Sequence, residues 1–134
     1  MIGILVLTHE DLGEHLIRCA CHVVGMQPPQ LKHLSIFARD DPEAVLTRAR
    51  EVIQQLDSGD GVLVLSDMFG ATPCNIASRL VQPGKVECIA GVNLPMLVRA
   101  LTYRNESLAT VIEKGLSGGQ CGVMQVEAEG RHAD

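Results

Sequence analysis

The chain opens with an apolar run that ends in a histidine, and this run constrains the fold more than any other stretch. Residues Ile2 to Leu7 are all apolar or glycine, with branched side chains dominating, and Thr8 and His9 follow directly. A strand that is apolar on both faces is typical of the centre of a parallel sheet covered by helices on both sides. Because open α/β folds bind their ligands at the carboxyl ends of the strands, we expect His9 to carry the function.

The composition is that of one domain with an aliphatic core. The chain has 134 residues, of which 46% are hydrophobic but only 2% aromatic, which suits a single domain with a sizeable core. The net charge is −5 and no basic patch is present, so we expect no nucleic-acid partner. No apolar run approaches the roughly 18 residues of a membrane span, and the amino terminus lacks the features of a signal peptide. We therefore expect a cytoplasmic protein.

The cysteines and the remaining histidines form no metal-binding pattern. The five cysteines are odd in number and contain no CxxC spacing, so we expect reduced, mostly buried thiols rather than disulfides or zinc. His15 and His22 lie seven residues apart, which is too far to chelate one ion, while His33 begins a strand and His132 lies in the polar tail. No glycine-rich nucleotide motif occurs. We expect neither a metal nor a cofactor.

The rest of the chain alternates between strands and helices. Further strands are predicted over Leu31–Phe37, Val62–Leu65, Val86–Ala90 and Gly122–Val126. Helices are predicted over about 12–24, from Pro42 after an Asp41 cap, from Thr72-Pro73 to Leu80, from about Pro95, and over 107–116. The first helix is expected to bury Leu12, Leu16, Cys19, Ala20 and Val23, and Ser117–Gly119 to be flexible. This order predicts one α/β domain over residues 1–126, doubly wound in three αβα layers, with a polar tail over 127–134.

The two strands with almost no polar residue belong at the centre of the sheet, which gives the strand order 2-1-3-4. In this order the chain leaves strands one and three in opposite directions, so the crevice between their carboxyl ends is the topological switch point. His9 follows strand one and Asp67 follows strand three. We expect the two side chains to face each other, because a carboxylate that accepts one ring N–H fixes the tautomer and stabilises positive charge on the ring.

A third component is expected from the loop after strand three. The N–H groups of Gly70, Ala71 and Thr72 would point into the crevice at the start of a helix that Thr72 caps and Pro73 enters. A helix N-terminus with free donors is suited to binding a phosphate. We predict that Thr8, Gly70, Ala71 and Thr72 bind phosphate while His9 and Asp67 are catalytic, an arrangement that fits phosphoryl transfer.

Three motifs at the strand ends resemble the enzyme IIA component of the mannose-type sugar phosphotransferase system (PTS), over about residues 1–126. They are Thr8-His9, Asp67-Met68-Phe69-Gly70-Ala71-Thr72-Pro73-Cys74-Asn75 and Ile89-Ala90-Gly91-Val92-Asn93-Leu94-Pro95-Met96-Leu97. The resemblance implies that His9 accepts a phosphoryl group on Nε2 from the carrier HPr and passes it to a IIB protein, without a metal. It also implies that Asp67 orients the ring and that Thr72 contacts the phosphoryl group. The short last strand would pair antiparallel with the partner subunit of a homodimer.

The chain departs from the family pattern at three positions near the site. Glu10 and Ala71 stand where glycine is common, and Cys74 stands where phenylalanine is common. A carboxylate at Glu10, beside an anionic site, could slow phosphorylation or change the choice of partner. With no IIB region in this sequence, we expect a stand-alone IIA protein, peripheral to a membrane transporter at most. One alternative is that the phosphoryl group serves as a signal to a regulatory target in place of IIB. The others are that the chain is a phosphoryl donor subunit for a dihydroxyacetone kinase, or a non-catalytic flavodoxin-like binding module.

Overall fold

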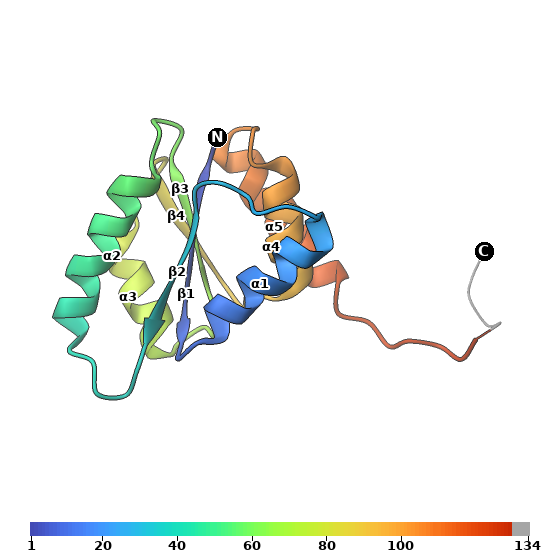
Figure 1. The fold of residues 1–134 in the computed structure, drawn as a ribbon, viewed down its shortest axis with the longest axis horizontal. Helices are drawn as coiled ribbons and strands as arrows, with labels where there is room; N and C mark the ends of the chain where they lie inside the picture. Colours follow the sequence, from blue (N-terminus) through green and yellow to red (C-terminus); the bar gives the residue numbers. More distant parts are fainter. Residues whose placement is uncertain (130–134) are drawn as a thin grey trace.

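The computed structural model describes residues 1–129 (Figure 1). The strands are β1 (Gly3–His9), β2 (Leu31–Ile36), β3 (Val62–Ser66) and β4 (Val86–Ala90). The helices are α1 (Leu12–Val24), α2 (Pro42–Leu56), α3 (Thr72–Leu80), α4 (Leu94–Tyr103) and α5 (Leu108–Cys121). Residues 130–134 of the predicted tail, including His132, lie outside the described residues.

The four strands form one parallel sheet in the order β2-β1-β3-β4, which confirms the predicted strand order. Leu7 of β1 stands opposite Ser66 of β3, so these two strands end side by side. Every residue of β3 is buried, as is every residue of β1 except His9. Two apolar runs distant in sequence therefore form the centre of the sheet, and their next residues meet at its carboxyl edge.

Helices cover both faces of the sheet, with α2 and α3 on one side and α1, α4 and α5 on the other (Figure 1). Alternate side chains of β1 enter two separate cores: Leu5 and Leu7 pack toward α2 and α3, whereas Ile4 and Val6 pack toward the opposite helices. This alternation follows from the two-residue period of a strand. The predicted doubly wound α/β fold with three layers is confirmed.

The buried face of α1 differs from the predicted stripe. Ala20 is buried and Leu16 half-buried, but the other three members of the stripe are exposed: Leu12, Cys19 and Val23. The helix instead turns Gly13 toward the sheet, where an added Cβ would lie 3.1 Å from Thr8 Oγ1. The small residues Gly13 and Ala20 thus allow a close approach to β1, while Leu16 packs at the margin of the core and Leu12 and Val23 are turned outward.

The prediction that a helix ends at Leu116 before a flexible Ser117–Gly119 is wrong. Helix α5 continues through this stretch to Cys121. A Cβ on Gly118 would lie 2.7 Å from Arg99 Cβ, and one on Gly119 would lie 2.7 Å from Met96 Cε. Glycine lowers helix propensity, but here the missing side chains let α5 pack closely on α4.

The C-terminal stretch predicted as a strand has no strand structure in the single chain. Residues 123–128 have no assigned secondary structure, and their large apolar side chains are exposed: Val123, Met124 and Val126. The expected pairing was with a partner subunit, so it stays a prediction. Among the described residues, no helix is both long and apolar enough to cross a membrane.

Candidate functional site

His9 and Asp67 meet where β1 and β3 end. His9 is the last residue of β1, and Asp67 directly follows Ser66, the last residue of β3. Asp67 Oδ2 lies 2.8 Å from His9 Nδ1 and also accepts a hydrogen bond from the His9 main-chain N–H at 3.0 Å. The predicted pair is therefore formed, and one carboxylate oxygen contacts both the main chain and the ring of the histidine.

The two side chains differ strongly in exposure. The Asp67 side chain is 10% exposed and the His9 side chain 49%. A mostly buried carboxylate therefore contacts an imidazole ring that solvent and partners can reach. A carboxylate beside Nδ1 favours the tautomer that carries its proton there, which leaves a free lone pair on Nε2. Asp67 Oδ1 is buried and accepts no hydrogen bond from the described residues.

Thr8 has a different structural setting from the one predicted. Its side chain is fully buried, and Oγ1 accepts a hydrogen bond from the Gly13 N–H at 2.7 Å. The hydroxyl therefore satisfies one of the free donors at the start of α1, as a capping side chain does. This bond fixes the turn that carries His9; a contact between Thr8 and a phosphoryl group stays an untested prediction.

The loop from Met68 to Ala71 leads into α3 at the same edge of the sheet. Gly70 has φ +83°, and the Ala71 N–H donates to Met68 O at 3.4 Å. The cap of α3 is Ala71 rather than the predicted Thr72, because the helix already begins at Thr72; no side chain caps it. The N–H groups of Gly70 and Thr72 donate no hydrogen bond to the described residues, which fits the expected anion cradle.

Glu10 adopts a backbone conformation that explains why glycine suits this position. Its φ is +46°, in the left-handed region, and its N–H donates to Ile36 O at 2.9 Å. This conformation costs a residue with a Cβ about 1–2 kcal/mol, a cost that glycine avoids. The chain therefore holds an exposed carboxylate, at some strain, directly after His9.

Exposed apolar side chains gather where three of the strands end at this edge of the sheet. Met68 and Phe69, directly after Asp67, are 61% and 86% exposed; Phe37 after β2 and Leu12 at the start of α1 are about half exposed. Such a surface beside an accessible histidine suits the docking of another protein. Met68 and Phe69 were not among the predicted site residues, although two large apolar residues in a loop beside a candidate nucleophile indicate a docking surface.

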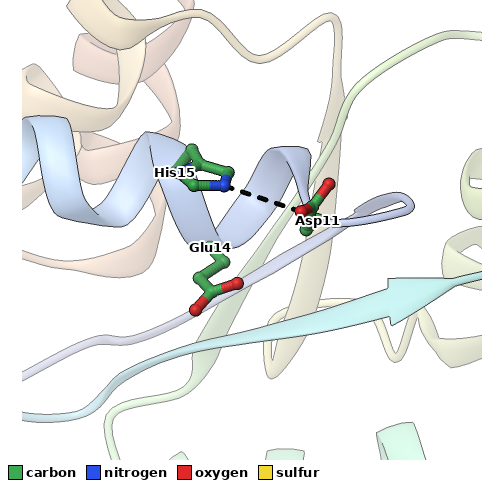
Figure 2. Close-up of side chains that lie close together, drawn as sticks. All are labelled: Asp11, Glu14 and His15. Carbon is green, nitrogen blue, oxygen red and sulfur yellow. Dashed lines mark ion pairs between the residues drawn. The ribbon is translucent and has the colours of Figure 1, made fainter.

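Asp11, Glu14 and His15 cluster at the start of α1 (Figure 2). Their ligand atoms all lie within 4.8 Å of one another, and His15 Nε2 lies 3.6 Å from Asp11 Oδ2. The Asp11 and His15 side chains are 67% and 56% exposed, and exposed pairs four residues apart on a helix are common. We assign no metal to this cluster.

Comparison with known proteins gives consistent similarities. The family described as "PTS system fructose IIA component" matches residues 3–114. The PTS mannose-specific EIIAB component of Escherichia coli K12 is 33% identical over 124 residues, and the match covers 87% of this chain and 38% of that protein. The chain thus spans less than half the length of this relative. A putative phosphotransferase enzyme IIA component of the same strain, YadI, is 36% identical, with 78% of this chain and 71% of that protein covered.

A solved structure supports the fold. The mannose/sorbose-specific IIA subunit of the phosphotransferase system from Enterococcus faecalis superimposes with a TM-score of 0.84. The match covers 95% of this chain and 96% of that chain, at 21% sequence identity. At this level of identity the similarity bears on the fold alone.

Proposed function

The chain belongs to the mannose- and fructose-type IIA family of the sugar phosphotransferase system, and from this premise we propose that His9 carries a phosphoryl group from one protein to another. The observation that supports this most directly is the 2.8 Å contact between His9 Nδ1 and Asp67 Oδ2. It orients an accessible imidazole and leaves Nε2 as the nucleophile.

The proposed reaction is a transfer between two histidines. The lone pair of Nε2 attacks the phosphorus of phosphorylated HPr, the phosphorus–nitrogen bond of the donor breaks, and its electron pair returns to the donor ring. Asp67 stabilises the positive charge that develops on the ring of His9 as the new bond forms, as a carboxylate partner of a histidine does. In a second transfer of the same kind, the phosphoryl group moves to a IIB protein.

The loop before α3 is the proposed site for the phosphoryl oxygens. The N–H groups of Gly70 and Thr72 donate to none of the residues that the structure describes, and next to the start of a helix they provide donors and a favourable dipole for an anion. We propose that Thr72, which is exposed, adds its hydroxyl, and that Ala71 contributes main chain only. Phosphoryl transfer depends mainly on such positioning and charge stabilisation, so neither a metal nor a cofactor is part of the proposal.

The proposal includes two protein partners and a second copy of the chain. The exposed apolar residues Met68 and Phe69 directly follow Asp67 and suit protein docking, with HPr and a IIB protein as the proposed partners in the cytoplasm. Within residues 1–129, the outer edge of β4 has no neighbouring strand and the stretch 123–128 pairs with none, which suits the strand exchange of a homodimer.

Glu10 supports a second candidate function, a regulatory module that binds partners without carrying phosphate. Its carboxylate directly follows His9, and a negative charge beside the site opposes the addition of a phosphoryl group. The two functions differ in whether His9 becomes labelled, so one experiment separates them. A regulatory protein or a dihydroxyacetone kinase as acceptor of the phosphoryl group would be found in the same experiment.

The test is incubation of the full chain with phosphorylated HPr, followed by mass measurement. We expect one acid-labile phosphoryl group on the wild type and none on His9→Ala, with His15→Ala as a matched control that labels normally. Equal labelling of His9→Ala, or no label on the wild type, would contradict the proposal, and the latter would favour the regulatory module. Adding candidate acceptors to the labelled protein then identifies what removes the phosphoryl group.

A further inference from the structure

A buried arginine lies at the amino edge of the sheet, opposite the His9 site. Arg104 directly follows α4 and is only 4% exposed. Its guanidinium donates to three main-chain carbonyls: Nε and Nη2 donate to Ile2 O, Nη2 also donates to Gln30 O, and Nη1 donates to Pro29 O. These bonds join the starts of β1 and β2 to the end of α4.

The charge of Arg104 has no counter-ion among the described residues. Its described ion pairs and hydrogen bonds include no carboxylate. Desolvation by burial lowers the pKa of the guanidinium below its ordinary value. Nη1 carries two N–H groups but makes a single described hydrogen bond, to Pro29. Among the described residues, the arginine therefore has one N–H without an acceptor and a positive charge that main-chain carbonyls solvate but no carboxylate neutralises.

The same arginine lines a hollow of about 290 Å³. Pro29, whose carbonyl accepts from Nη1, also lines it, so the hydrogen bond of Nη1 joins two of the residues that line the hollow. Most of the other lining residues are apolar: Met1, Val24, Met26, Pro28 and Leu101. The hollow therefore combines an apolar wall with one buried cation.

We propose that this hollow binds a small aliphatic monocarboxylate, with the carboxylate on Nη1 of Arg104 and the carbon chain against the apolar wall. Charge complementarity favours an anion, because a buried cation without a counter-ion gains most from one. The apolar lining favours a hydrocarbon chain over a sugar phosphate or a free inorganic anion. The volume is at the small end of ligand pockets, which span roughly 300–1,000 Å³, so a ligand of about eight non-hydrogen atoms such as hexanoate fits.

This binding is independent of the phosphoryl site. His9 is at the carboxyl end of β1, whereas Ile2, whose carbonyl holds Arg104, directly precedes the same strand. The ligand would not reach His9, but it would stabilise the junction of β1, β2 and α4.

The test is titration of the full, isotope-labelled chain with hexanoate and with its neutral analogue hexanamide, followed by amide NMR shifts. We expect shifts that concentrate on the residues lining the hollow, and an affinity for hexanoate about tenfold higher than for hexanamide. Met26→Asp places a negative charge on the exposed rim without touching Arg104. It should weaken hexanoate binding several-fold and leave hexanamide binding nearly unchanged.

Met68→Asp is the matched control, because Met68 is as exposed as Met26 but lies at the opposite edge of the sheet. It should bind hexanoate like the wild type. Equal affinities for hexanoate and hexanamide would overturn the role of Arg104. Shifts scattered over the surface, or none up to the solubility of hexanoate, would overturn the site itself.

Discussion

Asp67 Oδ2 holds His9 at two points, 3.0 Å from its main-chain nitrogen and 2.8 Å from ring Nδ1. The main-chain bond ties the end of β1 to the residue after β3, and the ring contact sets the direction of the imidazole. The register of the two strands ends with Leu7 opposite Ser66, directly before these residues, so the sheet itself brings the carboxylate to the histidine. Asp67 therefore contributes to both local structure and the proposed chemistry.

Asp67→Asn should slow phosphoryl transfer while the domain stays folded. The amide oxygen can still accept from the His9 N–H, but the negative charge that stabilises the ring is lost. Hydrogen bonds to charged groups contribute about 1.5–3 kcal/mol, which corresponds to a rate about 10- to 100-fold lower. Rapid-quench labelling by phosphorylated HPr measures the rate, and Asp60→Asn, at the other edge of the sheet, is the control. A normal transfer rate would remove Asp67 from the mechanism.

Glu10→Gly should both stabilise the domain and speed phosphorylation. Glycine relieves the positive φ of +46°, for a net gain of about 0.5–1 kcal/mol in the free energy of unfolding. Glu10→Gln removes the charge but keeps the strain, so the two variants separate the effects. In urea unfolding, only Glu10→Gly should be more stable than the wild type. Both variants should be phosphorylated by phosphorylated HPr a few-fold faster than the wild type. Wild-type labelling rates in both variants would show that the carboxylate does not oppose the incoming phosphoryl group.

The central strands and the His9–Asp67 pair were predictable, because a strand that is buried on both faces has an almost uninterrupted apolar sequence. Ile2–Leu7 and Val62–Leu65 are nearly free of polar residues, and a switch point between such strands leaves few positions for a ligand. The structure moves the strand ends by only a residue or two.

The helix faces were less predictable, because close packing is set by small residues. Gly13 and Ala20 face the sheet in α1, and Gly118 faces α4 in α5. A hydrophobicity pattern assigns large apolar residues such as Leu12 and Val23 to the buried face, which gives the wrong buried face for α1. It also treats glycine as the end of a helix, which makes α5 too short. Thr8 is a similar case, since the sequence alone does not reveal that its hydroxyl accepts a hydrogen bond from the Gly13 N–H.

Thr8→Val should destabilise the domain, and Thr8→Ser should not do so to the same degree. Valine keeps the shape but leaves the Gly13 N–H, which donates to Oγ1 at 2.7 Å, without a partner in a buried position. This loss costs about 1–2 kcal/mol, whereas serine retains the acceptor. Chemical denaturation measures the difference in the free energy of unfolding between the two variants. If the two unfold alike but Thr8→Val alone transfers phosphate slowly, Thr8 contacts the phosphoryl group, as the sequence first indicated.

Cys88 should be the last of the compared cysteines to react with an alkylating reagent. Burial, with a smaller effect of nearby Cys74, raises the pKa of its thiol from 9.0 to about 11, so the reactive thiolate is scarce at pH 8. Exposed Cys19 and Cys121 should react first, as peptide mass spectrometry after timed iodoacetamide treatment would detect. The thiol ionises at a lower pH in the unfolded chain than in the folded one. Its contribution to the free energy of unfolding is therefore fully present below pH 9.0 and decreases as the pH rises toward 11. Early labelling of Cys88 in the folded protein would contradict its burial.

Removal of residues 123–134 should convert a dimer into a folded monomer. Val123, Met124 and Val126 are exposed in the single chain, and β4 pairs with β3 on one side only, apart from the bridge between Gln82 and Val86. An apolar extended segment and a free sheet edge on one chain are complementary between two copies. Light scattering should give twice the chain mass for the wild type and one chain mass for the truncated protein, while circular dichroism stays the same. Removal of residues 127–134 alone is the control and should leave the dimer intact; a wild-type monomer at every concentration would refute the exchange.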